Sequence, residues 1–350
     1  MNPANEFPFG AAAELARRAL HTTGPILGFP MVGGASTRRF ARLRLGSGES
    51  LVAIYVPDAQ QSDELEKPGG PLARWPFLEI RDLLASRGIR VPAVTHEACD
   101  QGLLLVEDLG DLTLAAALEA APNLKVRLYQ LAVQDLAQAQ RALAALPADS
   151  VVGRREFDAD LLRWEIEHFR EWALEARGIA LSAGEREVFA RAADFLARTI
   201  ASWPKGFVHR DYQSRNLMVR VQESGEYNIT WIDFQDALLG PRVYDLVALL
   251  GDSYQVFEPA FVDDRLDEYA ATMTLDSCAR RQMRREFDLV TVQRKLKDAG
   301  RFVFIDRTKH NPTFLRFVEP TIEKVLSALA RLHDEPCLVA LDQMLRFRLG

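Results

Sequence analysis

The stretch from His209 to Asn216, HRDYQSRN, together with Asp233 in the run ITWIDFQDA, constrains the fold of this chain more than any other feature. Its polar residues follow a short apolar segment, so we expect a loop at the end of a strand. Two further strands are predicted at Leu217 to Val221 and at Tyr227 to Ile232, with a polar turn between them. Such a hairpin would bring Asn216 and Asp233 to the same edge.

These residue types suit phosphoryl transfer from ATP. That reaction needs a group that orients and deprotonates the attacking hydroxyl, and oxygen ligands for the magnesium on the phosphates. Asp211 fits the first role, and Asn216 with Asp233 fits the second, because magnesium is held by one or two carboxylates plus phosphates and waters. Protein kinases place Asn five residues after the Asp of H-R-D and end a later strand in D-F-G. Here Phe234 keeps the D-F pair, Gln235 takes the glycine position, and the pattern predicts a kinase.

The other charged residues of this loop, residues 209–216 or the catalytic loop, are less specific. His209 is expected to hold the loop by packing and hydrogen bonding. Arg210 and Arg215 either neutralise phosphate or substrate charge or pair with a nearby carboxylate. Asp245 lies in the first turn of a predicted helix, where it is expected to cap the helix and to accept hydrogen bonds from the loop backbone.

A nucleotide site is predicted in the first hundred residues. In MVGGASTRRF, glycines allow backbone N–H groups to approach phosphate oxygens, and arginines supply charge, although an ordinary strand-entry turn is the alternative. The predicted nucleotide-binding residues here are Gly33, Gly34, Ala35, Ser36, Arg38 and Arg39. Leu103 to Gly110 is expected to be the strand and hinge that bind adenine, through the Glu107 carbonyl and the Leu109 amide.

One departure from the protein-kinase pattern is evident. The strand Leu51 to Val56 has no lysine, whereas protein kinases carry one on the third strand for the α- and β-phosphates. Either Arg38 or Arg39 replaces it, or the phosphates depend more on metal and backbone contacts. Glu79 has a suitable location for the helix residue that would pair with such a lysine, or it belongs only to a solvated face of the helix.

Composition limits the class of partner and the compartment. The net charge of −6 leaves no broad basic face, so nucleic acid is an unexpected partner. No apolar stretch reaches the length of a membrane span, and the first twenty residues do not resemble a secretion signal. The three cysteines are few and far apart, which fits a reducing cytoplasm and excludes a cysteine-based metal site. We expect a cytoplasmic protein, with no protein partner implied.

The order of predicted elements indicates an α+β fold with two lobes. Residues 1–108 are predicted to form an N-terminal lobe with the nucleotide loop and hinge, and residues 109–350 a mainly helical C-terminal lobe with the catalytic loop, metal site and acceptor site. Strands are predicted at 39–45, 51–56, 94–98 and 103–107. Helices are predicted at 14–20, 71–88, 125–146, 159–176, 183–202, 243–254, 264–272, 277–299, 314–332 and 336–347. This is the outline of a bilobal protein-kinase-like fold with a small mixed β-sheet.

A family resemblance adds to these predictions. HRDYQSRNLM, IDFQDALLGPRVYDLVALLGDSY and VQRKLKDAGRF resemble the aminoglycoside phosphotransferase and choline kinase superfamily, and within it the bacterial anomeric kinases of N-acetylmuramate and N-acetylglucosamine. The likeness runs from about Gly33 to Phe317. It implies a bilobal kinase fold, Asp211 as catalytic base, and Asn216 and Asp233 as magnesium ligands. It also implies phosphorylation of the C1 hydroxyl of an amino sugar salvaged from the cell wall.

Residues that contact the acceptor are harder to assign. The candidates beside the motifs are Gln213, Gln235, Asp236 and Arg294. Arg215 is predicted to be a catalytic residue together with Asp211. Each could instead be a surface polar group or part of a helix salt bridge. The mixed charge around the loop slightly favours a neutral or anionic sugar over a polycationic antibiotic.

Two other functions are compatible with the sequence. The same fold could act on an aminoglycoside, choline, homoserine or another sugar. Alternatively, the chain could be a nucleotide-binding pseudokinase, which the absent strand lysine favours and the joint presence of Asp211, Asn216 and Asp233 disfavours. A serine/threonine protein kinase fits less well because no A-P-E run follows Asp233. The sequence leaves open the acceptor, the anomer, ATP versus GTP, the oligomeric state and any lobe closure.

Overall fold

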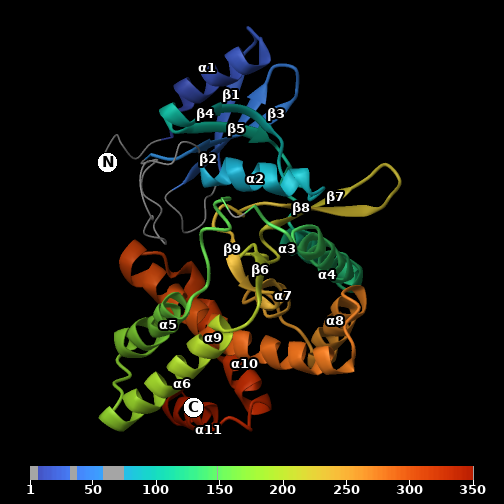
Figure 1. Ribbon diagram of the computed structural model, residues 1–350. Helices are drawn as coiled ribbons and strands as arrows, with labels where there is room; N and C mark the ends of the chain where they lie inside the picture. Colours follow the sequence, from blue (N-terminus) through green and yellow to red (C-terminus); the bar gives the residue numbers. More distant parts are fainter. Residues whose placement is uncertain (1–6, 32–37, 58–74, 148, 350) are drawn as a thin grey trace. The chain divides into compact units, whose positions relative to one another are not determined.

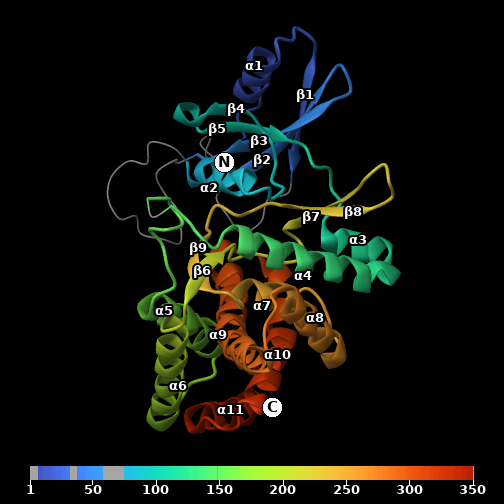
Figure 2. The ribbon, with the colours of Figure 1, turned by 45° about the vertical axis from the view of Figure 1, so that its right-hand side comes forward.

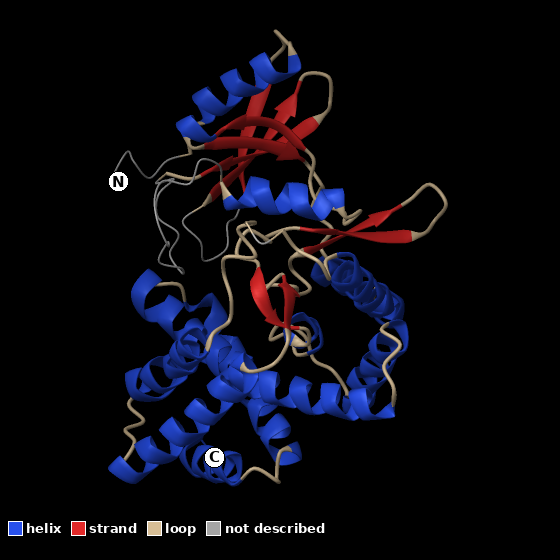
Figure 3. Ribbon diagram, in the orientation of Figure 1, coloured by secondary structure: helices blue, strands red, loops and turns tan. Residues whose placement is uncertain are grey.

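The computed structural model describes residues 7–31, 38–57, 75–147 and 149–349. The chain forms two units, of which unit 1 comprises residues 1–112 with 230–232 and unit 2 comprises residues 113–229 and 233–350. Unit 1 is built on a β-sheet and unit 2 is mainly helical (Figure 3), so the predicted α+β class is confirmed. Within the described ranges, no helix is both long and apolar enough to cross a membrane.

Unit 1 contains an antiparallel sheet with strand order β1-β2-β3-β5-β4 (Figure 1). Its strands are β1 (Ile26–Met31), β2 (Arg39–Leu45), β3 (Ser50–Tyr55), β4 (Val94–Ala98) and β5 (Leu103–Glu107), and its helices are α1 (Phe9–Leu20) and α2 (Pro76–Ser86). The register pairs Ala53 of β3 with Ala41 of β2 and with Leu105 of β5. The pair of Ala41 with Ala53 places two small residues in the middle of the sheet.

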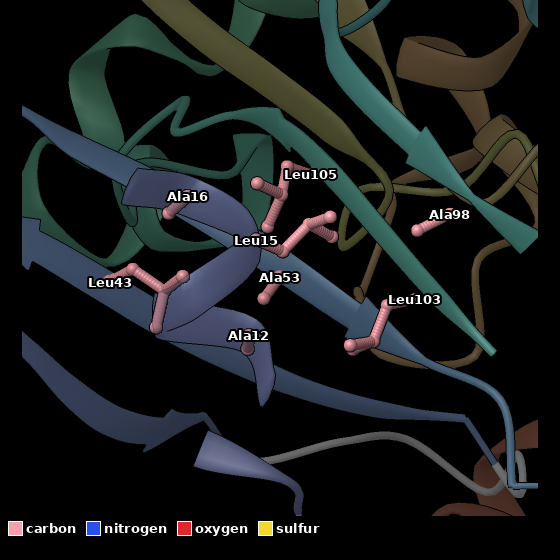
Figure 4. Close-up of a cluster of buried hydrophobic side chains, with 8 residues drawn as sticks. All are labelled: Ala12, Leu15, Ala16, Leu43, Ala53, Ala98, Leu103 and Leu105. Carbon is pink, nitrogen blue, oxygen red and sulfur yellow. The ribbon is translucent and has the colours of Figure 1, made fainter. Parts of the chain in front are cut away.

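The two helices of unit 1 contact side chains that alternate along the strands. Leu103 and Leu105 belong to the buried cluster that includes α1 (Figure 4), whereas Leu104 belongs to the cluster that includes α2. Successive strand residues point to opposite faces, so a run with both faces covered must be apolar throughout. This explains why β5 has the continuous sequence LLLV.

Unit 2 is mainly helical and carries two short β-ribbons, of which the last two residues of β8, Thr230 and Trp231, are assigned to unit 1 (Figure 2). The helices are α3 (Leu114–Ala120), α4 (Lys125–Ala142), α5 (Ala159–His168), α6 (Ala183–Ala201), α7 (Tyr244–Leu250), α8 (Pro259–Thr272), α9 (Ser277–Lys309), α10 (Val318–Arg331) and α11 (Pro336–Leu349), and a π-helical segment, Phe169–Leu174, continues α5. The ribbons are β6 (Lys205–Val208) with β9 (Leu238–Pro241), and β7 (Leu217–Val221) with β8 (Tyr227–Trp231).

Several element predictions were wrong or incomplete, each for a physical reason. Strand β1 is at the sheet edge, mostly exposed, and contains Pro30, which an edge strand tolerates, so it has no alternating pattern. The short elements α3 and β9 were also missed. Helix α7 ends at Leu250 rather than at residue 254, because Asp252 then accepts a hydrogen bond from the Tyr254 N–H in a turn.

Helix α9 runs ten residues further than the predicted end at Ala299, through Gly300. A Cβ atom at Gly300 would lie 2.3 Å from the backbone oxygen of His168 and 2.7 Å from the backbone nitrogen of Phe169. The glycine therefore allows α9 to pack backbone to backbone against the junction between α5 and the π-helical segment. This close packing fixes the helix that carries Arg294.

Candidate active site

The catalytic loop connects β6 to β7 within unit 2. Two backbone hydrogen bonds within the loop shape its turn. The Gln213 N–H donates to the Asp211 carbonyl at 2.9 Å, and the Asn216 N–H donates to the Gln213 carbonyl at 2.9 Å. The side chain of Asn216 closes the same turn with a 3.0 Å hydrogen bond to the Asp211 carbonyl oxygen. Residues 211 and 216 are thus held together by the loop itself.

Two buried carboxylates on and after α7 anchor the loop backbone. Asp245, which has no exposed surface, accepts hydrogen bonds from the His209 N–H at 2.7 Å and the Arg210 N–H at 3.0 Å. Asp252, equally buried, accepts from the N–H and the hydroxyl of Ser214 at 3.0 and 2.5 Å. The predicted contact of Asp245 with the loop backbone is confirmed, and Asp252 provides a second anchor that we did not predict.

Arg210 is a structural residue of the loop. Its φ of 77° lies in the left-handed region, which costs energy for a residue other than glycine. Its guanidinium forms a buried ion pair with Glu165 of α5 at 2.9 Å, and Gln293 of α9 donates to the other oxygen of Glu165 at 2.9 Å. Of the two roles considered for Arg210, the structure shows pairing with a carboxylate.

Arg294 of α9 contacts both the backbone and the side chain of the loop. Its guanidinium donates to the Arg210 carbonyl at 2.6 Å and to the Asp211 carboxylate at 3.3 Å, and it lies 4.8 Å from the centre of the Tyr244 ring. The Arg294 side chain is 2% exposed, whereas that of Asp211 is 34% exposed. A substrate can therefore reach Asp211, while Arg294 supports it from the protein interior.

The charges around Asp211 keep it ionised. Burial alone would raise the pKa of its carboxyl, but the positive charges of Arg294, Lys297 and Arg210 outweigh burial and hold that pKa below its usual value. An ionised carboxylate accepts hydrogen bonds from a hydroxyl and can receive its proton as the hydroxyl reacts. Asp211 has the exposure and the charge state that such a role needs.

Asn216 and Asp233 lie next to each other. The Asn216 side-chain nitrogen is 3.4 Å from an Asp233 carboxylate oxygen, and the Gln235 side-chain nitrogen donates to the other oxygen at 3.2 Å. Asp233 has a left-handed φ of 63°, a strained conformation that turns the chain at the end of β8. The same Gln235 amide donates to Asp236 at 2.8 Å, and its own oxygen is buried with no hydrogen-bond partner.

This donor set fits magnesium. A carboxylate and an amide supply hard oxygen ligands, and magnesium in phosphoryl-transfer sites usually keeps waters and substrate phosphates as its other ligands. Among the residues that the structure describes, no group of three or more His, Cys, Asp and Glu side chains forms a larger metal cluster. Asn216 and Asp233 could hold such an ion between them.

Arg215 differs from the other arginines of the site. Its side chain is exposed, and its guanidinium carbon lies 3.7 Å from the centre of the Tyr254 ring and 5.6 Å from that of Phe317. Gln213, beside it in the loop, is half-buried and contributes the backbone hydrogen bonds described above. Within the described part of the chain, neither side chain forms a hydrogen bond with Asp211.

The predicted nucleotide residues belong to unit 1. Arg39 begins β2 and Arg38 precedes it, whereas residues 33–36 lie outside the described residues. Glu107 ends β5, and its N–H donates to the Ala93 carbonyl at 2.8 Å. Leu109 follows in the segment predicted as the hinge. Glu79 lies in the first turn of α2.

Arg42 of β2 anchors that hinge segment to the sheet. It donates to the carboxylates of Asp108 at 2.7 Å and Asp111 at 2.8 Å, and the Ser50 hydroxyl donates to Asp108 at 2.6 Å. Although burial raises the pKa of Asp108, the hydrogen bonds from Ser50 and Arg42 lower it below its usual value overall. The backbone of residues 108–111 is therefore fixed where an adenine contact was predicted.

Sequence reasoning missed Glu165, Asp252 and Tyr254. Glu165 is 1% exposed and follows Leu162 at helical spacing on the apolar face of α5, so a charged residue at a core position was a detectable signal. Asp252 comes directly after the apolar run of α7, but no pattern in the sequence links it to Ser214, 38 residues away. Contacts of this kind are set by tertiary packing.

We expect Arg294→Gln to lower kcat by about tenfold to a hundredfold, because a hydrogen bond to a charged group contributes about 1.5–3 kcal/mol. The variant should also move the acid limb of kcat/KM to higher pH. Burial raises the pKa of Asp211 and Arg294 lowers it. Without Arg294, this pKa is therefore higher, and the carboxylate takes up a proton at higher pH. Arg294→Lys, which keeps the charge, should move the limb less. An unchanged pH profile in Arg294→Gln would contradict this role.

Comparison with known proteins identifies a family match and named relatives for this chain. The family model described as phosphotransferase enzyme family, APH, matches residues 30–282. The chain is 31% identical over 323 residues to the N-acetylmuramate/N-acetylglucosamine kinase of Pseudomonas aeruginosa, covering 90% of this chain and 87% of that protein. The protein of the same name from Neisseria meningitidis serogroup B is 30% identical over 298 residues, with 81% of each chain covered.

Solved structures show the same fold at low identity. A GDP complex of wild-type aminoglycoside 2'-phosphotransferase-IIIa has a TM-score of 0.61 and 12% identity, covering 93% of this chain and 99% of that one. Plasmodium vivax ethanolamine kinase has a TM-score of 0.54 and 12% identity, covering 87% and 82% of the two chains. The predicted protein-kinase-like fold is thereby confirmed.

Proposed function

This chain belongs to the phosphotransferase enzyme family, and from that premise we propose that it transfers the γ-phosphoryl group of ATP to the anomeric C1 hydroxyl of an N-acetylated hexosamine. The acceptors we propose are N-acetylmuramate and N-acetylglucosamine, which the curated relatives carry in their names. The observation that supports the chemistry best is the partly exposed Asp211, whose backbone carbonyl accepts a hydrogen bond from the side chain of Asn216, the neighbour of Asp233.

In the proposed reaction, the C1 oxygen attacks the γ-phosphorus, the bond from that phosphorus to the β–γ bridging oxygen breaks, and ADP leaves. Asp211 orients the C1 hydroxyl and accepts its proton. A hemiacetal hydroxyl is more acidic than other sugar hydroxyls, so a carboxylate whose pKa lies below its usual value still serves as the acceptor. The rigid loop supports this role, because it holds Asp211 in one place by buried contacts with Asp245 and Arg294.

Magnesium, when bound by Asn216 and Asp233, supplies positive charge to the phosphates. The residues of this chain then fix where those two ligands lie. Gln235 keeps the Asp233 carboxylate in position by its 3.2 Å hydrogen bond, and the turn at Asn216 sets the distance to Asp211. In unit 1, we propose that Arg38, Arg39 and the backbone of Glu107 and Leu109 bind the nucleotide.

An acceptor panel with coupled detection of ADP tests this proposal. We expect magnesium-dependent ADP release with N-acetylmuramate and N-acetylglucosamine, and none above background with kanamycin, choline or homoserine. N-acetylglucosamine blocked at C1 as its methyl glycoside should be inactive, because the reacting oxygen then has no proton to lose. Phosphorylation of the methyl glycoside would show that another hydroxyl reacts, and activity only with kanamycin would replace the acceptor class altogether.

A further inference from the structure

Arg215 is a cation of the catalytic loop that serves none of the contacts holding the loop together. Arg210 pairs with Glu165, and Arg294 with Asp211. Among the residues that the structure describes, Arg215 has no carboxylate within ion-pair distance, and its side chain is exposed. It lies in the chain between Asp211 and Asn216, one residue from the proposed metal ligand. An exposed charge at this place is available to a substrate.

The guanidinium of Arg215 is nevertheless held in one orientation. It lies 3.7 Å from the centre of the Tyr254 ring, and the Phe317 ring meets Tyr254 edge-on with centroids 4.8 Å apart. Arginine stacks well on aromatic faces because its guanidinium is planar and weakly hydrated. Stacking covers one face of the group and leaves its N–H donors at the edge for hydrogen bonding. Such a group loses little entropy when it binds an anion.

One buried carboxylate fixes both partners of this stack. Asp252 accepts hydrogen bonds from Ser214, the residue before Arg215, and from the backbone N–H of Tyr254 at 2.9 Å. The loop that carries the arginine and the ring beneath it are thus tied to the same group. Burial raises the pKa of Tyr254, and the charge of Arg215 opposes that rise, as expected for a guanidinium stacked on the ring.

We propose that Arg215 binds the carboxylate of the lactyl group of N-acetylmuramate and so distinguishes this acceptor from N-acetylglucosamine. This inference depends on the proposed function. The two sugars differ only in the lactyl ether at C3, which is anionic in the first and absent from the second. A guanidinium matches a carboxylate with two parallel hydrogen bonds. Because C3 belongs to the same ring as the reacting C1, the charge to be recognised lies a few bonds from the atom that faces Asp211.

The test compares the two sugars in the same variants. Arg215→Met keeps an apolar side chain on the Tyr254 ring but removes the charge. Arg215→Lys keeps the charge but cannot donate the two parallel hydrogen bonds of a guanidinium. We expect the ratio of kcat/KM for N-acetylmuramate to that for N-acetylglucosamine to fall by about tenfold or more in Arg215→Met, since a hydrogen bond to a charged group is involved. The loss in Arg215→Lys should be smaller. Thermal unfolding of each variant checks that the fold is kept.

Arg316 provides a matched control, because its guanidinium lies 4.7 Å from the centre of the Phe317 ring but outside the catalytic loop. Arg316→Met should leave the ratio unchanged. The methyl ester of N-acetylmuramate lacks the negative charge, so the charge can be removed from the substrate as well as from the enzyme, as in a double-mutant cycle. It should react more slowly than the acid in the wild type and equally fast in Arg215→Met.

The outcomes separate this inference from the proposed function. If both sugars are phosphorylated and Arg215→Met lowers kcat/KM for both by the same factor, Arg215 acts on the phosphates, and the inference is wrong while the function stands. A shift of the ratio in Arg316→Met alone would also overturn it. If neither sugar is phosphorylated by the wild type, it is the proposed function that fails.

Discussion

Replacing Asp211 with Asn should lower kcat by about a thousandfold, within the range for loss of a positioned general base. The amide has the size of the carboxylate but takes up no proton at neutral pH. Its oxygen still accepts the hydrogen bond from Arg294, and the side chain is partly exposed, so the fold should be kept. Steady-state ADP release with N-acetylmuramate measures the loss, and thermal unfolding tests the fold.

Asp194 offers a control for the same chemical change. It lies on α6, with a half-exposed side chain that pairs with Arg163 at 2.8 Å. Arg163 also pairs with Glu167, and a surface ion pair of this kind contributes about 0–1 kcal/mol. Asp194→Asn should retain wild-type turnover. If Asp211→Asn kept most of its activity while Asp194→Asn behaved as expected, the base would have to be sought elsewhere in the site.

Replacing Asp233 with Asn should lower kcat by about a hundredfold or more, because metal ligation contributes several kcal/mol to phosphoryl transfer. The change keeps the shape of the side chain and its oxygen, but it removes the charge that balances a divalent ion. The hydrogen bond from Gln235 to that side chain can still form. A titration with magnesium at saturating ATP measures the effect on both kcat and the magnesium concentration required.

The magnesium titration also separates the two roles. Activity of Asp233→Asn should recover in part as the magnesium concentration rises, since the lost ligand weakens binding of the ion. Activity of Asp211→Asn should stay low at every magnesium concentration. An Asp233→Asn variant with the magnesium dependence of the wild type would exclude Asp233 as a ligand.

The chemistry of the site could be inferred from local sequence. The catalytic loop and the hairpin after it span 25 residues, so short-range turn and strand preferences are enough to place Asn216 next to Asp233. The continuous apolar run of β5 and the apolar faces of the long helices likewise follow from the spacing of apolar residues along the chain. For this reason, the α+β class, the kinase-like fold and the family resemblance could be predicted from the sequence alone.

What surrounds the loop was decided by tertiary packing. Arg294 is 83 positions from Asp211, Glu165 is 45 from Arg210, and Asp252 is 38 from Ser214, and no local preference relates such pairs. Each became a partner because helices α5, α7 and α9 pack around the loop, with Gly300 allowing the backbone of α9 to approach the end of α5. Residue type and spacing along the chain were enough to propose which groups do chemistry. Only the folded chain decided which charges are buried beside them, because burial is a property of helix packing.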